Sequence, residues 1–233
     1  MTDAPALNDD YRRLRSYVGG GEDPADPADV RAMQMVLRIE KADPPDRGEL
    51  LTAAARAVAM VCLDDRSGGD GPWATQMDEW CDARIRKIAR RARGAHWIAA
   101  QGVWGVTVTH GAAQARAIVP SRMGDVDRRI SRLQIGGTDV AGVVPTSAVS
   151  PPAVSGPTLW VDPRLGMTVG KMAAQVGHAA MLAVRMMSLE EVVDWRSEQC
   201  PLAVRMAPVE RWADLLAADA VGRAVAVRDA GFT

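Results

Sequence analysis

The sequence predicts an α/β protein in which a small mixed β-sheet is flanked by helices, and three observations support this. Short apolar runs with strand-like alternation are separated by longer segments with helical periodicity. In the C-terminal part these runs alternate regularly, which is typical of a sheet covered by helices. A faint sequence repeat suggests that this C-terminal part, a β-α-α-β-α unit, is preceded by a degenerate copy of the same unit. With 233 residues, 48% of them apolar, the chain can bury a sizeable core in one or two domains.

The first thirty residues are polar and rich in Asp, Gly and Pro, so we expect 1–30 to be a flexible N-terminal tail with one short helix at 11–18. A divergent α/β region is expected over 31–142. Its predicted elements are a strand at 33–40, helices at 47–63 and 73–93, strands at 96–101, 103–109 and 115–119 with a turn at Gly111, and a helix at 124–133.

Residues 143–157 contain four prolines with serines and a threonine among them, and we predict a linker there. The last domain is then 158–233, where strands and helices alternate. The predicted order is a strand at 158–161, helices at 170–187 and 189–197, a strand at 202–206, a helix at 208–218 and a strand at 223–228. Ligands favour the C-terminal ends of the strands in such folds.

A shift of 122 residues aligns the two halves of the chain. It places Gly48–Leu50 on Gly170–Met172 and gives both halves the order strand, helix, helix, strand, helix. Shared alanine-rich composition is the alternative explanation. If the repeat is real, Glu49, Ala53 and Arg56 replace the polar residues of the C-terminal copy, and the N-terminal copy is a scaffold or an intramolecular partner.

Charge and cysteine content bound the class of protein. The formal net charge of -1 argues against a strongly basic nucleic-acid-binding protein, although a local basic patch stays compatible with it. Cys62, Cys81 and Cys200 show no zinc-binding spacing, so we expect reduced thiols and no metal site. The N-terminus lacks signal-peptide features, and no apolar run reaches the roughly 20 residues of a membrane span. We therefore expect a cytoplasmic protein without membrane association.

The most informative segment is Gly170–His178, with the sequence GKMAAQVGH, which follows a predicted strand and a glycine-containing turn. At about 100° per residue, Lys171, Gln175 and His178 fall on one side of a helix. A lysine in the first turn opposes the helix dipole, so it favours a site for an anion or a developing oxyanion. The segment is not a P-loop, because it is one residue short and Met172 replaces the Ser or Thr that binds magnesium. ATP or GTP hydrolysis is therefore not expected.

The second informative segment is Val225–Thr233, an apolar stretch that leads into Asp229, a small residue and a glycine. Sites in α/β proteins assemble at strand C-terminal ends, so we expect Asp229 to approach Lys171 and His178 across the sheet. The alternative is a turn aspartate that is hydrogen-bonded to its own backbone.

Together the two segments resemble the archaeal and eukaryotic type of peptidyl-tRNA hydrolase, which some bacteria also have. That family carries Gly-Lys-(Ile/Met)-Ala-Ala-Gln-x-x-His-Ala after its first strand, and Gly170–Ala179 matches it. It also carries Asp-Ala-Gly-Arg-Thr near its C-terminus, which Asp229–Thr233 matches with Phe232 in place of arginine. The resemblance covers about residues 158–233. The family continues into a Pro-Gly-Thr-like turn and a last strand, whereas this sequence stops at Thr233, so we expect a fragment or a sheet without its last strand.

The resemblance implies a carboxylic ester hydrolase that releases peptide and free tRNA from peptidyl-tRNA without a metal or an organic cofactor. It also implies which residues form the site. The catalytic residues are Lys171, His178, Asp229 and Thr233, and the substrate-binding residues are Gly170, Gln175 and Arg228.

Each implied catalytic residue has a chemical role in ester hydrolysis. Lys171 suits the oxyanion or a phosphate, and Asp229 suits the activation or orientation of the attacking water. His178 is a proton relay or an orienting donor, with a locally bonded helix histidine as the alternative. Thr233 binds the substrate or holds Asp229.

A third feature is the basic second half of the helix predicted at 73–93. Arg86, Arg90 and Arg93 are expected on one face of that helix. They form either a solvated face that the helix dipole favours or a contact with the RNA backbone.

The leading hypothesis is a cytoplasmic, cofactor-independent α/β peptidyl-tRNA hydrolase whose partner is peptidyl-tRNA. The alternative is a non-catalytic RNA- or protein-binding module that keeps the hydrolase fold, which Phe232 and the end of the sequence at Thr233 favour. A third hypothesis is a homodimerisation domain built on Ala- and Gly-rich helix packing.

Overall fold

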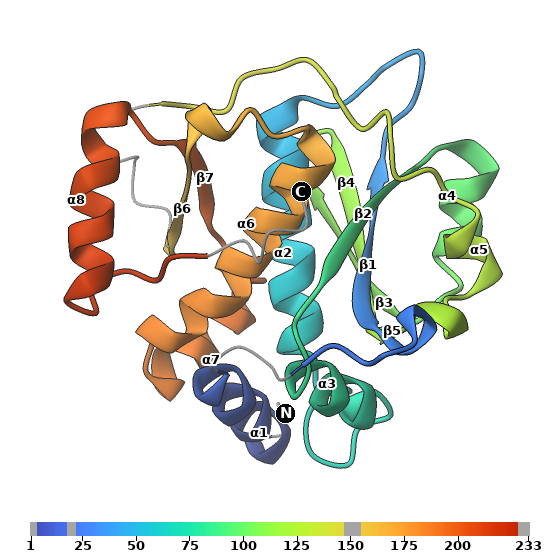
Figure 1. The fold of residues 1–233 in the computed structure, drawn as a ribbon, viewed down its shortest axis with the longest axis horizontal. Coiled ribbons are helices and arrows are strands. Elements are labelled where there is room, and N and C mark those ends of the chain that lie inside the picture. The colour runs from blue at the N-terminus through green and yellow to red at the C-terminus, as the bar shows by residue number, and fades with distance from the viewer. Residues whose placement is uncertain (1–3, 18–21, 147–154, 228–233) are drawn as a thin grey trace.

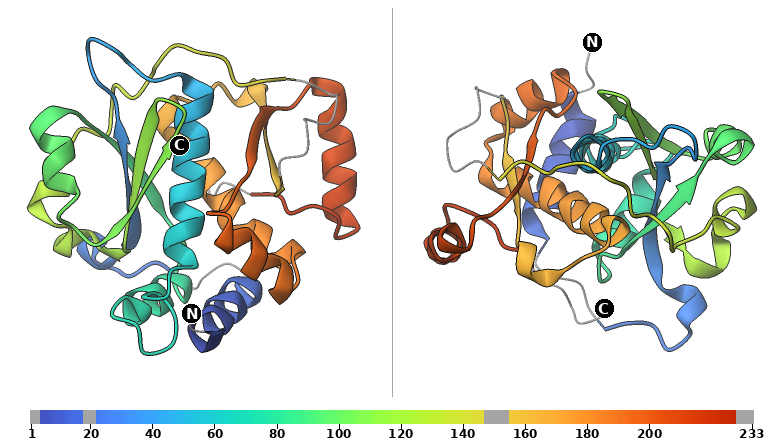
Figure 2. Two further views of the ribbon diagram at one scale, coloured as in Figure 1. Left: turned by 180° about the vertical axis from the view of Figure 1, so that it is seen from behind. Right: turned by 90° about the horizontal axis from the view of Figure 1, so that it is seen from above.

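A computed structural model describes residues 4–17, 22–146 and 155–227, and it has a layered α/β fold (Figure 1). Two short helices, a five-stranded mixed sheet, a central pair of helices, a two-stranded parallel sheet and an outer helix follow one another across the molecule. The view from behind shows the same order, with the central helix pair between the two sheets (Figure 2). The predicted α/β class is therefore confirmed.

The larger sheet combines parallel and antiparallel pairing. Its strands are β1 (Arg31–Arg38), β2 (Lys87–Ala92), β3 (Gly105–His110), β4 (Ala113–Ile118) and β5 (Ser121–Arg122). The order is β2-β1-β4-β3, and β5 pairs with the start of β1. β1 and β2 are parallel, whereas β4 is antiparallel to both of its neighbours. Gly111 turns the β3–β4 hairpin with a φ of 55°, which confirms the predicted turn.

Alternate residues of each strand face two separate cores. On β1, Met33, Met35 and Leu37 join the main core, whereas Val36 joins a smaller core on the opposite face. The helices that cover the main core are α2 (Arg47–Cys62) and α6 (Val169–Ala183), and those that cover the smaller core are α4 (Gly94–Ala100) and α5 (Arg128–Ser131) (Figure 1). Because strand residues alternate between the two faces of the sheet, α6 covers the face that carries the main core.

The smaller sheet consists of the parallel strands β6 (Thr158–Val161) and β7 (Ala203–Met206). Between them lie α6, the 3-10 turn η4 (Val184–Met186) and α7 (Leu189–Ser197), and α8 (Val209–Ala220) follows β7. α7 has the bounds that the sequence predicts. Ser188 and Glu191 form a reciprocal capping box at its start. α8 lies on the outer side of this sheet (Figure 1).

Small residues hold the central helix pair together. Both helices bury several alanines, namely Ala53, Ala54 and Ala57 on α2 and Ala173 and Ala180 on α6. A Cβ at Gly177 of α6 would lie 3.0 Å from Cγ2 of Val58, so a glycine permits this close approach. The main core includes residues from both halves of the chain. The division into separate domains stays a prediction.

The N-terminal segment differs from the flexible tail that we expected. Its helix, α1 (Ala4–Ser16), begins earlier than the short helix predicted at 11–18. Leu7 and Leu14 lie on the same face of this helix, away from solvent, and are buried in the main core. Burial of this apolar face fixes the helix against the rest of the fold.

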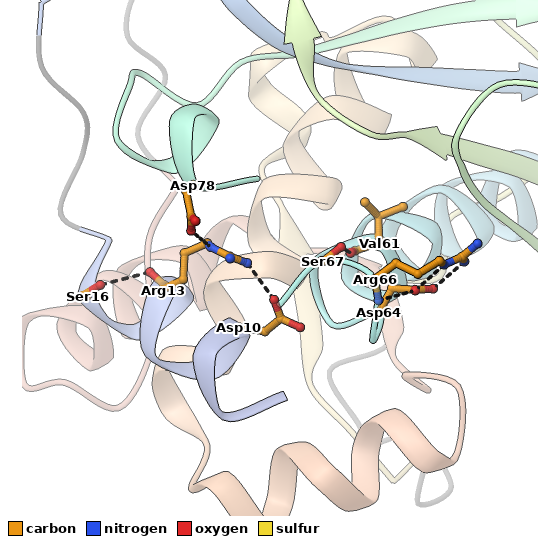
Figure 3. A network of polar contacts seen from close by, with 8 residues as sticks. All are labelled: Asp10, Arg13, Ser16, Val61, Asp64, Arg66, Ser67 and Asp78. Carbon is orange, nitrogen blue, oxygen red and sulfur yellow. Dashed lines mark hydrogen bonds and ion pairs between the residues drawn. The ribbon is translucent and has the colours of Figure 1, made fainter. Parts of the chain in front are cut away.

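Polar contacts add to the docking of α1 (Figure 3). Arg13 contacts Asp10 of the same helix and Asp78 of α3 (Ala74–Cys81), each at 2.6 Å. In the nearby loop after α2, Arg66 and Asp64 form an ion pair at 2.6 Å. α1 is therefore tied to α3 by a charged group as well as by apolar burial.

The long helix predicted at 73–93 is wrong beyond Cys81. After α3 the chain forms β2, which pairs in parallel with β1 at one edge of the larger sheet. Residues 87–92 are Lys, Ile, Ala, Arg, Arg and Ala, most of which are strong helix formers. Tertiary strand pairing overrides that local preference, and the sequence pattern alone did not reveal it.

Two further predicted elements differ from the structure. The strand predicted at 96–101 is α4, and the helix predicted at 124–133 is a 3-10 turn η2 (Met123–Asp125) followed by the short α5. The predicted linker packs on the core where it is described: Val144 is buried, and the carbonyl of Pro145 accepts the Met206 N–H at 2.9 Å. Residues 147–154 lie outside the described part.

The two parallel strand pairs share one order of elements. β1, α2, α3, β2 and α4 run strand, helix, helix, strand, helix, and so do β6, α6, α7, β7 and α8. α2 begins at Arg47 and α6 at Val169, which is the shift of 122 residues that aligns the sequence segments. The shared order supports a repeat, whose common origin stays a prediction.

Candidate functional site

The predicted site segment lies where β6 leads into α6. The carboxylate of Asp162 accepts hydrogen bonds from the backbone and the guanidinium of Arg164 in the 3-10 turn η3 (Pro163–Leu165). Gly166 then adopts a left-handed φ of 54° and turns the chain. Thr168 caps α6 by accepting the Lys171 N–H at 3.3 Å. A turn therefore places Lys171 in the first turn of a helix, as predicted.

The first N–H groups of α6 are already bonded to side chains. Oδ1 of Asp139 accepts the Val169 N–H at 3.0 Å, and Oγ1 of Thr138 accepts the Gly170 N–H at 2.9 Å. With Thr168, three of the helix's unpaired donors are satisfied. Asp139 also supplies the negative charge that the helix dipole favours at this end. These three N–H groups are therefore already bonded within the protein, and the anion site expected beside Lys171 stays a prediction.

Gly170, which we expected in substrate binding, has a packing role. It is buried, and a Cβ there would lie 2.7 Å from Oγ1 of Thr138. A side chain at this position would displace Thr138 and break its hydrogen bond to the helix. The glycine is thus explained by the close approach of residue 138 to α6.

Lys171, Gln175 and His178 share one face of α6, and each is half-buried. At 1.5 Å of rise per residue, Lys171 and His178 are about 10 Å apart along the axis. A small reacting group therefore meets both side chains only if the long lysine side chain extends toward the histidine. Gln175 lies between them on the same face.

His178 contacts a lysine from the other half of the chain. Nζ of Lys87, the first residue of β2, lies 3.1 Å from Nδ1 of His178. Lys87 is not among the predicted site residues, because the contact joins residues 91 positions apart and depends on the packing of α6 against β2. The available signal was that Lys87 is one of three lysines in a chain rich in arginine.

Lys87 is buried without a carboxylate partner in the described part of the chain. It is 8% exposed, and its Nζ lies 4.7 Å from the centre of the Trp80 ring and 3.8 Å from Sδ of Met181. Burial lowers the pKa of Lys87 to about 7. Burial, and then the charge of Lys87, lower the pKa of His178 well below its ordinary 6.5.

The second half of the predicted site is not described. Arg228, Asp229 and Thr233 lie outside the described residues, so their approach to Lys171 and His178 stays a prediction. The strand predicted at 223–228 does not form over 223–227. Instead, a carboxylate oxygen of Asp219 accepts the Ala226 N–H at 3.0 Å, which holds this stretch against the end of α8.

The three arginines predicted on one helix face occupy different surroundings. Arg86 pairs with Asp23 at 2.7 Å, and Arg93 is exposed just before α4. Arg90 is buried and bonds to Gln34 and to backbone carbonyls. Because these residues belong to a strand and its flanks, the predicted single basic face is wrong, and Arg90 is inaccessible to an RNA backbone.

The described residues contain neither a metal-binding cluster nor a helix that could span a membrane. No group of three or more His, Cys, Asp or Glu side chains among them is placed to hold a metal ion. None of their helices has the length and apolar character that crossing a bilayer demands. A surface hollow beside the larger sheet, lined by residues that include Gln34, Trp104 and Arg129, does not include the predicted site residues.

Comparison with known proteins gives no family for this chain. No protein-family model, curated protein or solved structure matches it. A function for the protein can therefore be inferred only from the residues of α6 and their neighbours.

Proposed function

We propose that the protein hydrolyses the ester bond of peptidyl-tRNA. The observation that carries this proposal is the segment Gly170–Ala179, which follows a strand and places Lys171, Gln175 and His178 on one face of α6. The same segment carries the resemblance to peptidyl-tRNA hydrolases. The bound Thr138, Asp139 and Thr168 hold the start of the helix and so fix the position of Lys171.

The proposed chemistry is addition of water to the ester carbonyl and release of the tRNA ribose hydroxyl. The peptide leaves with a free carboxyl group, and the hydroxyl takes up the proton that the attacking water loses. Lys171 is the group that stabilises the developing oxyanion or a nearby phosphate, since the helix N–H groups are already bonded. Asp229 is proposed to orient the water.

The test is hydrolysis of a purified peptidyl-tRNA, measured as release of the peptide. We expect Lys171→Ala and Asp229→Ala each to lower kcat/KM by about 100-fold or more, the usual effect of losing a group that stabilises the transition state. The matched control is Lys41→Ala, which removes an exposed lysine far along the chain and should leave turnover unchanged. Preincubation with EDTA should not slow the reaction.

Unchanged turnover in both variants would contradict the proposed hydrolysis, provided that their thermal unfolding matches that of the parent protein.

A second function, non-catalytic RNA binding, is favoured by one observation: side chains already occupy the helix N–H groups that could have held an oxyanion. Binding of peptidyl-tRNA without turnover would support that alternative.

A further inference from the structure

The contact between Lys87 and His178 is unusual in its chemistry. A buried cation ordinarily has a carboxylate partner, because removal of a charge from water costs several kcal/mol. No ion pair of Lys87 exists within the described residues, and Lys87 is only 8% exposed. Leucine or methionine would fill the same strand position at lower cost, so packing alone does not explain the lysine.

The surroundings of Lys87 are arranged for an ammonium group. An ammonium has three N–H donors and no acceptor. The groups around Nζ are Nδ1 of His178 at 3.1 Å, Sδ of Met181 at 3.8 Å and the face of the Trp80 ring at 4.7 Å. All three are electron-rich and uncharged, and each can accept from the ammonium. The thiols of Cys62 and Cys81 are the other titratable groups that act on Lys87.

We propose that Lys87 is a positioning residue that fixes His178 as the neutral tautomer with its proton on Nε2. When Lys87 is charged it can only donate, so Nδ1 of His178 has to accept and cannot carry a proton. Two cations at 3.1 Å would repel strongly, so the histidine stays neutral while the lysine is charged.

The functional consequence of this tautomer concerns Nε2, the other ring nitrogen of His178. Nε2 of His178 has no hydrogen-bond partner within the described residues, and it is not among their buried unpartnered atoms. As an N–H it donates and does not accept. His178 therefore acts as an orienting donor rather than as a general base, and this consequence for catalysis rests on the proposed ester hydrolysis. The N-terminal half of the chain then contributes a residue to a site on the C-terminal half.

The test is long-range proton–nitrogen NMR on protein labelled with ¹⁵N at histidine. The chain has three histidines, so the His178→Gln variant identifies the signals of His178. In the parent protein between about pH 5 and 6.5, where an ordinary histidine titrates, we expect a neutral ring with the proton on Nε2. A proton on Nδ1, or titration at the ordinary value of about 6.5, would overturn the proposal.

The Lys87→Met variant supplies the second arm, because methionine has a similar length and no charge. We expect His178 in this variant to populate both tautomers and its proton affinity to rise at least about 10-fold, since one unit of pKa is a tenfold change. Lys41→Met, at an exposed position, should leave the His178 signals unchanged. An unaltered His178 in Lys87→Met also overturns the proposal. If this variant does not fold, the parent spectrum alone decides.

The hydrolysis assay separates this proposal from the proposed function. Under both proposals, Lys87→Met lowers kcat with little change in KM, and the pH dependence of kcat changes. A parent protein that shows the Nε2 tautomer and no hydrolysis refutes the function and leaves the role of Lys87 intact. A parent protein that hydrolyses peptidyl-tRNA with the proton of His178 on Nδ1 refutes the role of Lys87 alone.

Discussion

Two arginines, Arg90 and Arg116, are buried without a carboxylate partner among the described residues. Arg90 and Arg116 lie on either side of Val36 on one face of the larger sheet. Arg90 donates to carbonyls at the end of α5, and Arg116 donates to carbonyls at the end of α4. Carbonyls at a helix C-terminus lack intrahelical donors and carry the negative end of the dipole. Each arginine thus supplies hydrogen-bond donors to the carbonyls at the C-terminal end of a short helix.

Asp10 gives a prediction for stability against pH. Burial raises the pKa of Asp10 to about 8, because its Oδ2 has no partner within the described residues and Arg13 is shared with Asp78. The folded protein therefore binds this proton more tightly than the unfolded chain. The resulting stability is fully present below about pH 4 and is lost as the pH rises through about 8.

Asp10→Asn removes this dependence, because an amide is neutral at every pH. We expect the free energy of unfolding of the variant, relative to the parent protein, to increase by more than about 1 kcal/mol between about pH 4 and 8. Urea denaturation at several pH values measures it. Asp43→Asn, at an exposed loop position, is the control and should show no such trend. Parallel curves for the parent and Asp10→Asn would contradict the prediction.

At the scale of elements, the contact between α2 and α6 depends on Gly177. A Cβ there would lie 3.0 Å from Cγ2 of Val58 and 3.3 Å from Cδ of Lys87. Gly177→Val adds two further carbons at this contact, so we expect a loss of about 1–3 kcal/mol in unfolding free energy from overpacking. Gly136→Val, where a Cβ would meet nothing within 4 Å, should be close to neutral in the same denaturation experiment. Equal effects of the two substitutions would contradict the importance of the close approach.

Strong local signals made much of the C-terminal half predictable. Ser188 and Glu191 mark the start of α7, and the turn before α6 is visible as a glycine-containing stretch. β2 was missed, because its residues are helix formers and its strand pairing depends on β1, about fifty positions earlier. For the site, the sequence predicted the shared face of Lys171 and His178. It did not predict Lys87, whose contact exists only once α6 packs on β2.

At the scale of the molecule, the central helices make reciprocal contacts. His178 of α6 contacts Lys87 in the N-terminal half. Arg56 of α2 donates two hydrogen bonds, of 2.9 and 3.1 Å, to the carbonyl of Gln199 in the C-terminal half. Under the shift of 122 residues, Arg56 and His178 occupy equivalent positions. Each central helix therefore uses the same position to hold the opposite half.

The shared core and these contacts predict that both halves unfold together. We expect a single calorimetric transition whose measured enthalpy equals its van't Hoff enthalpy, the signature of a two-state process. Tryptophan fluorescence and far-ultraviolet circular dichroism should give the same midpoint. Two resolved transitions, or different midpoints for the two probes, would contradict this and would support the predicted separation at 143–157.

The order of the elements along the chain has a consequence for the assembly of the protein during synthesis. β1, α2, β2, β3 and β4 leave the ribosome before α6, so the larger sheet can pair before His178 and Met181 of α6 cover Lys87. Docking of α6 completes the burial that lowers the pKa of Lys87 from its ordinary 10.5 to about 7. At mildly alkaline pH the arriving helix therefore expels a proton as it docks, and acidic conditions oppose this last step. The helix that carries the candidate site is thus seated by a step that responds to the acidity of the surrounding solution.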